Sequence, residues 1–324
     1  MNWALPAVAV LVGVWALIRS SDHFVQGASG IATWYKLSPL VIGIVIVGFG
    51  TSAPEMVVSA SSALKGNPAL ALGNAYGSNI ANIGLILGIT ALIIPIQVHS
   101  SLLRKELPLL TLVTLVSFAI LYNLQLSRLD GVILLIVFAL VMTLTIWMSL
   151  KNPNDEMLKT LSEELPVGAV SLKKALLQLV AGLVLLILSS KAVVWGAVEL
   201  ATLAGISELV IGLTVVAVGT SLPELASTLA AVRKGEHDMA IGNVVGSNLF
   251  NTLAVVGIAS CISPFALDKE VLTRDFPVMG LLTLSLFLIG WGRRGRGGRI
   301  NRFEGGVLLT CFVAYTLWLL RSIF

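Results

Sequence analysis

Long apolar runs, separated by short polar turns, occupy almost the whole chain. A helix needs roughly 20 apolar residues to cross the hydrocarbon core of a bilayer, and the sequence offers about ten such runs. The pattern predicts helices over residues 3–33, 38–64, 68–94, 108–122, 131–150, 170–202, 207–232, 238–262, 277–291 and 305–322. The predicted fold is an all-α membrane protein with ten transmembrane helices.

The second half of the chain repeats the first at a fixed offset of 169 positions. Gly-Thr-Ser-Ala-Pro-Glu at 50–55 returns as Gly-Thr-Ser-Leu-Pro-Glu at 219–224, and over 38–95 we count 24 identities in 58 ungapped pairs. This is an internal duplication. Five helices per half is an odd number, so the second half enters the membrane from the opposite side and the repeats are inverted. The predicted division is a first repeat at 1–150, a linker at 151–169 and an inverted repeat at 170–324.

Composition supports a membrane protein. The 324 residues are 56% hydrophobic and only 12% charged, with a mean hydropathy of +0.95, which is too little polar surface for a soluble globule of this size. Cys261 and Cys311 lie in or beside apolar runs, where packing is expected rather than a disulfide or a metal site.

Lys and Arg are unevenly divided between the two sides of the predicted membrane. With alternate loops on opposite sides and Lys191 left out, 15 fall on one side and five on the other. Cytoplasmic loops carry the excess, so the linker is predicted to be cytoplasmic and both termini extracytoplasmic. The net charge of +4 follows from this topology, and nucleic-acid binding is not expected.

Each copy of the motif carries a glutamate inside an apolar run, at Glu55 and Glu224. A carboxylate at that depth costs roughly 2.5 to 3.5 kcal/mol and usually lines a polar path or faces a partner. Thr51 and Glu55 are four residues apart and share one helix face, with Ser52 beside them. Pro54 lacks an N–H, so it is predicted to kink the helix and to free backbone carbonyls nearby.

The same features recur at Thr220, Ser221, Pro223 and Glu224. The next helix of each half adds a second polar face, formed by Ser78 and Asn82 in the first half and by Ser247 and Asn251 in the second. Glycines four residues apart are predicted to let another backbone approach, at Gly73 and Gly77 and at Gly242 and Gly246.

All of these side chains offer oxygen, and no His or Cys accompanies them. Such a shell suits Ca²⁺ or Na⁺ rather than a soft metal. The two negative charges of the carboxylates balance one Ca²⁺ or two Na⁺, but they do not balance one Ca²⁺ and two Na⁺ at the same time. Mutual exclusion within inverted repeats that alternate around a fixed site is the physical basis of antiport.

The paired motifs resemble the two signature repeats of the calcium/cation antiporter superfamily, in particular its prokaryotic sodium/calcium exchangers, over nearly the whole chain. The resemblance implies Na⁺/Ca²⁺ exchange across a prokaryotic inner membrane, without a cofactor. It also implies that the second, third, seventh and eighth helices enclose the ions while the first and sixth slide against them. Carried over position by position, the implied ligands are Gly48, Thr51, Ser52, Glu55, Ser78, Asn82, Ala217, Thr220, Ser221, Glu224, Ser247 and Asn251. Relatives that also carry potassium have Asp at the position of Asn251, so potassium dependence is not expected.

Three alternatives stay open. In a Ca²⁺/H⁺ exchanger, Glu55 and Glu224 would alternate between a proton and the metal. A passive cation channel would lack dependence on a Na⁺ gradient. A membrane-embedded hydrolase using Ser52 or Ser221 has no His or Lys base beside either serine, so the chain is not expected to be an enzyme. Asp22, near the end of the first long helix, is interpreted as snorkelling, with a gating role as the alternative.

Overall fold

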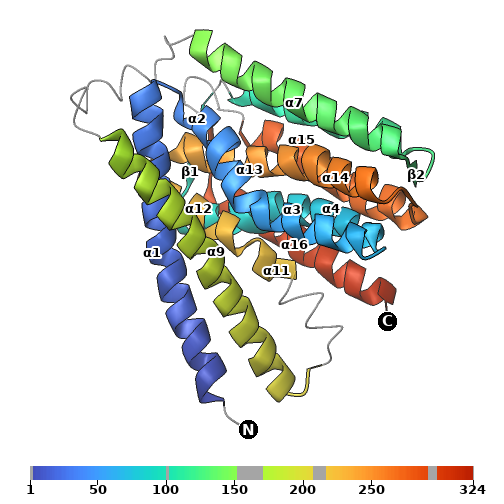
Figure 1. The fold of residues 1–324 in the computed structure, drawn as a ribbon, viewed down its shortest axis with the longest axis horizontal. Helices are drawn as coiled ribbons and strands as arrows, with labels where there is room; N and C mark the ends of the chain where they lie inside the picture. Colours follow the sequence, from blue (N-terminus) through green and yellow to red (C-terminus); the bar gives the residue numbers. More distant parts are fainter. Residues whose placement is uncertain (1–2, 100–101, 152–170, 207–216, 291–297, 324) are drawn as a thin grey trace.

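A computed structural model describes residues 3–99, 102–151, 171–206, 217–290 and 298–323, and this part of the chain is almost entirely helical (Figure 1). The helices are α1 (Ala4–Tyr35), α2 (Pro39–Ile42), α3 (Gly48–Leu64), α4 (Pro68–Ala81), α5 (Gly88–Ile93), α6 (Leu107–Leu121), α7 (Arg128–Lys151), α9 (Leu172–Leu203), α11 (Ala217–Thr220), α12 (Leu222–Arg233), α13 (His237–Leu249), α14 (Val256–Ile262), α15 (Phe276–Ile289) and α16 (Arg302–Ile323).

Eight helical stretches within the described residues are long and apolar enough to cross a membrane. They are Ala4–Tyr35, Pro39–Leu64, Pro68–Ile93, Arg128–Lys151, Leu172–Leu203, His237–Ile262, Val271–Ile289 and Arg302–Arg321. The helix predicted at 108–122 corresponds to α6, which is not among the eight. The predicted seventh helix falls partly on 207–216, outside the described residues, as does most of the predicted linker.

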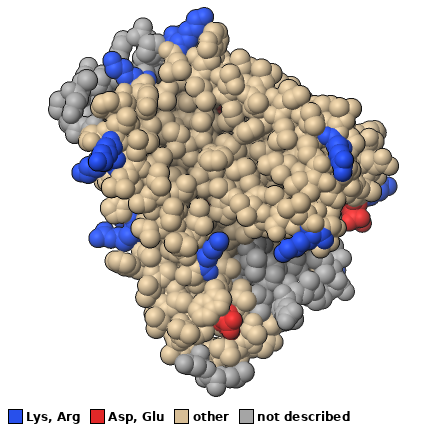
Figure 2. Space-filling view, in the orientation of Figure 1, with Lys and Arg blue, Asp and Glu red and all other residues tan. Residues whose placement is uncertain are grey.

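Most of the face shown in Figure 2 carries no charged side chains, and its Lys and Arg lie mainly towards the edges. An uncharged surface bounded by basic residues is what a membrane protein presents to lipid and to the headgroups beside it.

α1 and α9 lie side by side and run across the direction of the other long helices (Figure 1). They meet at glycines that occupy equivalent positions in the two halves. A Cβ added at Gly27 would lie 2.7 Å from the carbonyl oxygen of Ala175, and one added at Gly196 would lie 2.6 Å from that of Pro6. Only glycine permits this approach, so the two helices form one tightly packed pair.

Several of the remaining helices, α2, α3, α4, α6 and α12, pack against α13, which is buried from Asp238 onward. A Cβ added at Gly246 would lie 2.7 Å from the Cα of Ile44, so the backbones of α13 and the first half's second helix are in contact. The close approach predicted at four glycines is thus found at Gly242 and Gly246. At Gly73 and Gly77, no described atom outside the neighbouring backbone of the same helix lies within 4 Å of an added Cβ.

Short π-helical turns, which the sequence analysis did not predict, widen several helices. They lie at Gly43–Val47, Asn82–Leu87, Leu102–Glu106, Phe250–Val255 and Val271–Asp275. A π turn inserts one residue into the helical repeat and is frequent at functional sites. Two of these turns carry the predicted ligands Asn82 and Asn251.

Two very short strand pairs join the ends of the helices. β1 (Ile96–Val98) pairs antiparallel with β4 (Gly298–Ile300), and β2 (Gln125–Leu126) pairs antiparallel with β3 (Phe265–Ala266). The offset of 169 carries the start of β1 onto the start of β3. Each pair therefore joins one half to the other.

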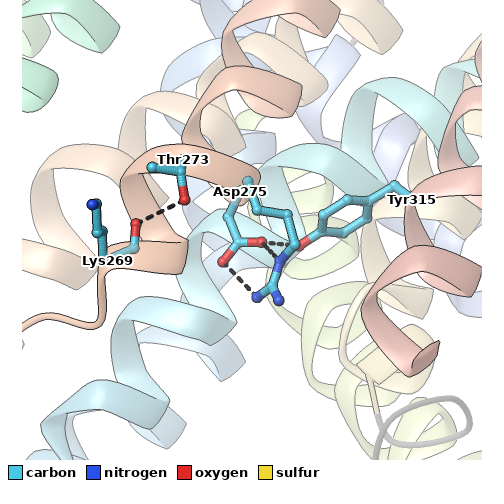
Figure 3. Close-up of polar contacts among 5 residues, drawn as sticks. Lys269, Thr273, Asp275 and Tyr315 are labelled. Carbon is cyan, nitrogen blue, oxygen red and sulfur yellow. Dashed lines mark hydrogen bonds and ion pairs between the residues drawn. The ribbon is translucent and has the colours of Figure 1, made fainter. Parts of the chain in front are cut away.

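In a polar cluster at the start of α15, oppositely charged side chains pair with each other (Figure 3). Arg274 Nε donates to Asp275 Oδ1 at 2.7 Å, and the Tyr315 hydroxyl donates to the same oxygen at 3.0 Å. The contact with Tyr315 ties α15 to α16, so this cluster serves packing at a helix end.

At another helix end, His99 and Asp238 form a pair whose strength should depend on pH. His99 Nδ1 lies 2.9 Å from Asp238 Oδ1, and this hydrogen bond raises the pKa of His99 above its ordinary value near 6.5. The stability that the pair contributes is therefore fully present below about pH 6.5 and is lost as pH rises through the raised pKa. We expect the difference in thermal stability between wild type and His99→Gln to be largest at pH 6 and to shrink at alkaline pH. A difference that stays the same from pH 6 to alkaline pH would contradict this role of the pair.

Candidate cation site

The two motif glutamates are both buried and close to one another. Glu55 on α3 is 0% exposed and Glu224 on α12 is 1% exposed. Glu224 is within electrostatic reach of Glu55, and Ser52 Oγ donates to Glu224 Oε1 at 3.2 Å. The structure thus brings acids from the two halves together, as the sequence predicted.

Much of the polar surface around these acids has no protein partner. Buried oxygen or nitrogen atoms without a hydrogen bond to any described residue occur in eight residues, and five of these are predicted ligands. The five are Glu55, Asn82, Ser221, Glu224 and Asn251. A buried polar group without a hydrogen-bond partner lowers the stability of the folded protein. Ten of the predicted ligands carry a side-chain oxygen that could bind a cation. The unpartnered oxygens of these three side-chain types, Glu, Asn and Ser, therefore fit a hard cation.

Thr51 links the two halves through its hydroxyl. Thr51 Oγ1 donates to Asn243 Oδ1 at 3.0 Å and lies 3.5 Å from Ser247 Oγ, both on α13. It also lies 3.1 Å from the carbonyl oxygen of Val47 in its own helix. Thr51 and Ser247, two predicted ligands from opposite halves, are therefore in contact.

The polar face of the following helix lies against the motif helices in both halves. Ser78 is on α4, Asn82 begins the π turn after it, and Asn251 lies in the corresponding turn of the second half. α3 contacts both α4 and the turn that holds Asn251, and the turn that begins at Asn82 contacts α12. Asn82 Nδ2 donates to Asn248 Oδ1 at 3.0 Å, which leaves Asn82 Oδ1 unpartnered among the described residues.

The other predicted ligands lie at helix ends. Gly48 begins α3, and its carbonyl oxygen is 3.5 Å from Thr51 Oγ1. Thr220 is half-buried at the end of α11, which contacts α4. Ala217 begins α11, and its side chain lies outside the described part of the structure.

The two motif copies adopt different backbone structures. Pro54 lies inside the continuous helix α3. In the second half, Ser221 interrupts the corresponding helix and divides it into α11 and α12. Pro223 then sits in the first turn of α12, where a missing N–H costs nothing. Glu224 falls in the same turn, where the positive end of the helix dipole stabilises a negative charge.

Asn243 and Asn248 reach the site although they were not among the predicted site residues. Asn243 accepts from Thr51, and Asn248 accepts from Asn82. The sequence carried a signal for both, since they recur at the fixed offset as Asn74 and Asn79.

The site is chemically simple. The part of the chain that the structure describes contains no group of three or more His, Cys, Asp or Glu able to hold a metal. The charge at the centre thus comes from two carboxylates, and the surrounding side chains supply neutral hydroxyl and amide oxygens. Alkali and alkaline-earth cations prefer such ligands.

Known proteins resemble this chain over nearly its full length. The family described as sodium/calcium exchanger protein matches residues 5–147 and 174–321. The chain is 46% identical to the putative antiporter CaxA of Alkalimonas amylolytica, over 97% of this chain and 98% of that one. It is 32% identical to the sodium/calcium exchanger MaX1 of Methanosarcina acetivorans, over 94% of this chain and 96% of that one.

The fold has a counterpart among solved structures. The sodium-calcium exchanger NCX_Mj superimposes with a TM-score of 0.81 at 31% sequence identity, covering 96% of this chain and 97% of that one. A family match over most of the chain and a shared fold at this identity agree with the paired motifs. The chain belongs to the sodium/calcium exchanger family.

Proposed function

We propose that this protein exchanges Na⁺ for Ca²⁺ across a membrane by alternating access around the buried site. The observation that carries the proposal is the meeting of Glu55 and Glu224, from opposite halves, with carboxylate oxygens that have no partner among the described residues. The proposed ligands are Gly48, Thr51, Ser52, Glu55, Ser78, Asn82, Ala217, Thr220, Ser221, Glu224, Ser247 and Asn251.

Charge explains why the two ions exclude each other. Glu55 and Glu224 together neutralise one Ca²⁺ or two Na⁺. Adding Na⁺ to a site that already holds Ca²⁺ leaves a net positive charge in surroundings of low dielectric constant, where uncompensated charge is costly. Each face of the membrane therefore exchanges one load for the other.

The proposed architecture is ten transmembrane helices in two inverted repeats, at 1–150 and 170–324, joined by a cytoplasmic linker. The fixed offset between the halves supports it, as do the equivalent glycines of α1 and α9. The α1–α9 pair would move against the remaining helices, in keeping with rocking of one bundle around a fixed site. Both termini would face outward from the inner membrane of a prokaryotic cell.

The test is uptake of radioactive Ca²⁺ into proteoliposomes of the purified protein. Vesicles loaded with Na⁺, or with choline at equal osmolarity, are diluted into Ca²⁺ at the same pH inside and outside. We expect uptake that requires internal Na⁺ and that stops when a Na⁺ ionophore dissipates the gradient.

The same vesicles separate the alternatives. Uptake driven only by an imposed pH gradient would replace the proposal with Ca²⁺/H⁺ exchange, in which the two buried acids take up protons. Uptake that ignores both gradients would indicate a passive channel.

A further inference from the structure

Asn243 connects the two halves of the site through one buried amide. Its Nδ2 group lies 3.3 Å from the carbonyl oxygen of Glu224, 3.2 Å from Ser227 Oγ and 2.9 Å from Thr228 Oγ1. Its Oδ1 atom accepts from Thr51 Oγ1 at 3.0 Å. The side chain is 1% exposed, so water cannot readily substitute for these contacts.

The chemistry of the amide fixes the direction of the contact with Thr51. An amide oxygen can only accept, so Thr51 donates in this contact, and it shares its single hydroxyl proton between Asn243 and the carbonyl oxygen of Val47. A hydroxyl whose proton is held by these two acceptors keeps its lone pairs for a cation on the other side. Side chains that hydrogen-bond to a metal-binding residue commonly orient it in this way.

We propose that Asn243 is a positioning residue, which orients the hydroxyl of Thr51 and fixes its spacing from Glu224. The proposal rests on the proposed function, because it assigns Thr51 and Glu224 to the transported cation. Its repeat counterpart, Asn74, is half-buried and donates to Ser59 at 3.2 Å, which reproduces the contact between Asn243 and Thr228. Asn74 thus provides a matched control.

The test compares Asn243→Ala with Asn74→Ala in Na⁺-loaded proteoliposomes. We expect Asn243→Ala to raise the KM for Ca²⁺ by about tenfold, with a smaller change in kcat, and Asn74→Ala to change KM by less than about twofold. A purely structural role would lower the melting temperature without moving the KM of the folded protein.

A double-mutant cycle decides whether Asn243 acts through Thr51. Thr51→Val removes the hydroxyl and keeps the side-chain shape, so adding Asn243→Ala to it should raise KM by much less than on the wild type. Equal effects in both backgrounds would overturn the proposal. A wild type without Na⁺-driven uptake would instead remove the proposed function itself.

A second feature concerns the surface between the α1–α9 pair and the other helices. Ser29 Oγ on α1 donates to Glu236 Oε1 at 2.7 Å, and Asp22 Oδ1 on α1 lies 3.9 Å from Lys234 Nζ. Lys234 and Glu236 both lie at the turn between α12 and α13. These two contacts therefore fasten α1 to one end of the remaining bundle.

The duplication allows no equivalent at the opposite end. The counterparts of Ser29 and Glu236 are Val198 and Asn67, so neither the hydroxyl nor the carboxylate is present. The counterparts of Asp22 and Lys234 are both lysines, Lys191 and Lys65, which would repel rather than pair. The sequence thus permits these contacts at one end only.

Another contact across the same surface is different, because both halves can make it. Ser190 Oγ on α9 donates to the carbonyl oxygen of Gly219 at 3.2 Å. Its counterpart Ser21 donates to Ile18 within α1, at 2.9 Å, although the counterpart of Gly219 is also a glycine, Gly50. Exchanging the roles of the halves would re-form the serine contact and would lose the two contacts of Asp22 and Ser29.

We infer that the pairs Ser29–Glu236 and Asp22–Lys234 form a latch that favours the conformation seen here over its repeat-exchanged alternative. Ser29–Glu236 carries most of the effect, since a partly exposed ion pair as long as 3.9 Å contributes little. Favouring one of two alternating states weakens apparent ion affinity at the face to which the other state opens.

The test measures the KM for Ca²⁺ at both membrane faces, in right-side-out and everted vesicles. Ser29→Val with Glu236→Asn copies the opposite end and removes the latch, whereas Val198→Ser with Asn67→Glu installs it there. We expect both variants to move the ratio of the two KM values in the same direction, by about threefold or more.

A matched comparison keeps the latch falsifiable. Ser21→Val removes the hydroxyl of a serine that bonds within its own helix here, so it should stabilise the present state slightly or leave the ratio unchanged. An unchanged ratio in both latch variants, with Na⁺-driven uptake intact, would overturn the latch. Loss of that uptake in the wild type would count against the proposed function.

Discussion

Glu55→Gln or Glu224→Gln is expected to abolish Na⁺-driven Ca²⁺ uptake while leaving the protein folded and inserted. Either change removes one of the two buried negative charges and leaves a divalent cation half-neutralised. Removing one partner of a buried ionic contact costs about 3 kcal/mol or more, which corresponds to a loss of more than about 100-fold in affinity. Initial rates of uptake at matched amounts of reconstituted protein measure the loss.

The control is a glutamate that lies outside the site. Glu270 is exposed before the start of α15, so Glu270→Gln should retain the wild-type rate. Wild-type exchange in Glu55→Gln or in Glu224→Gln would contradict the assignment of that residue as a ligand.

Gly246→Val is expected to prevent stable folding. The added side chain would have to occupy space already filled by the backbone of Ile44, whose Cα lies 2.7 Å from the position of an added Cβ. Backbone atoms cannot turn away as a flexible side chain can, so α13 would have to separate from the first half. The expected cost is at least about 3 kcal/mol, at the upper end of what overpacking produces. The fraction of monodisperse protein after detergent extraction, together with its melting temperature, measures the effect.

Gly306 serves as the control for size and chemistry. An added Cβ there would lie 3.8 Å from the nearest atom, Leu92 Cδ2, within ordinary contact distance. Gly306→Val should therefore express and melt much as the wild type does. Equal tolerance of the two substitutions would show that the backbone contact at Gly246 is not tight.

The meeting of the two glutamates could be predicted because it depends only on the repeat and on helical periodicity. A carboxylate inside an apolar run must face something polar, and an exact offset of 169 residues places a second carboxylate in the corresponding apolar run of the other half. Thr51 and Ser52 follow from their spacing to Glu55 on the same helix. No tertiary information was needed for these residues.

The difference between the two motif copies could not be predicted, because their sequences are nearly identical. Ala53 in one copy is replaced by Leu222 in the other. α3 nevertheless continues through Pro54, whereas the corresponding helix of the second half is interrupted at Ser221. The local sequence allows both backbones, so the surrounding helices must select between them.

The contact between Asn243 and Thr51 could not be predicted, for the same reason. Asn74 and Asn243 stand at equivalent positions, but in this structure Asn243 alone of the two bonds to Thr51. The short strands were missed because pairs of two or three residues are too short to show an alternating pattern. These features depend on contacts between segments far apart in the chain.

Competition between the two cations at equilibrium tests the central claim most directly. Binding of radioactive Ca²⁺ to the purified protein is measured over a series of fixed Na⁺ concentrations at constant ionic strength and pH. The account predicts that Na⁺ raises the apparent Kd for Ca²⁺ without lowering the number of Ca²⁺ ions bound at saturation. An apparent Kd that stays constant as Na⁺ rises would contradict it, because the two ions could not then be sharing one pair of carboxylates.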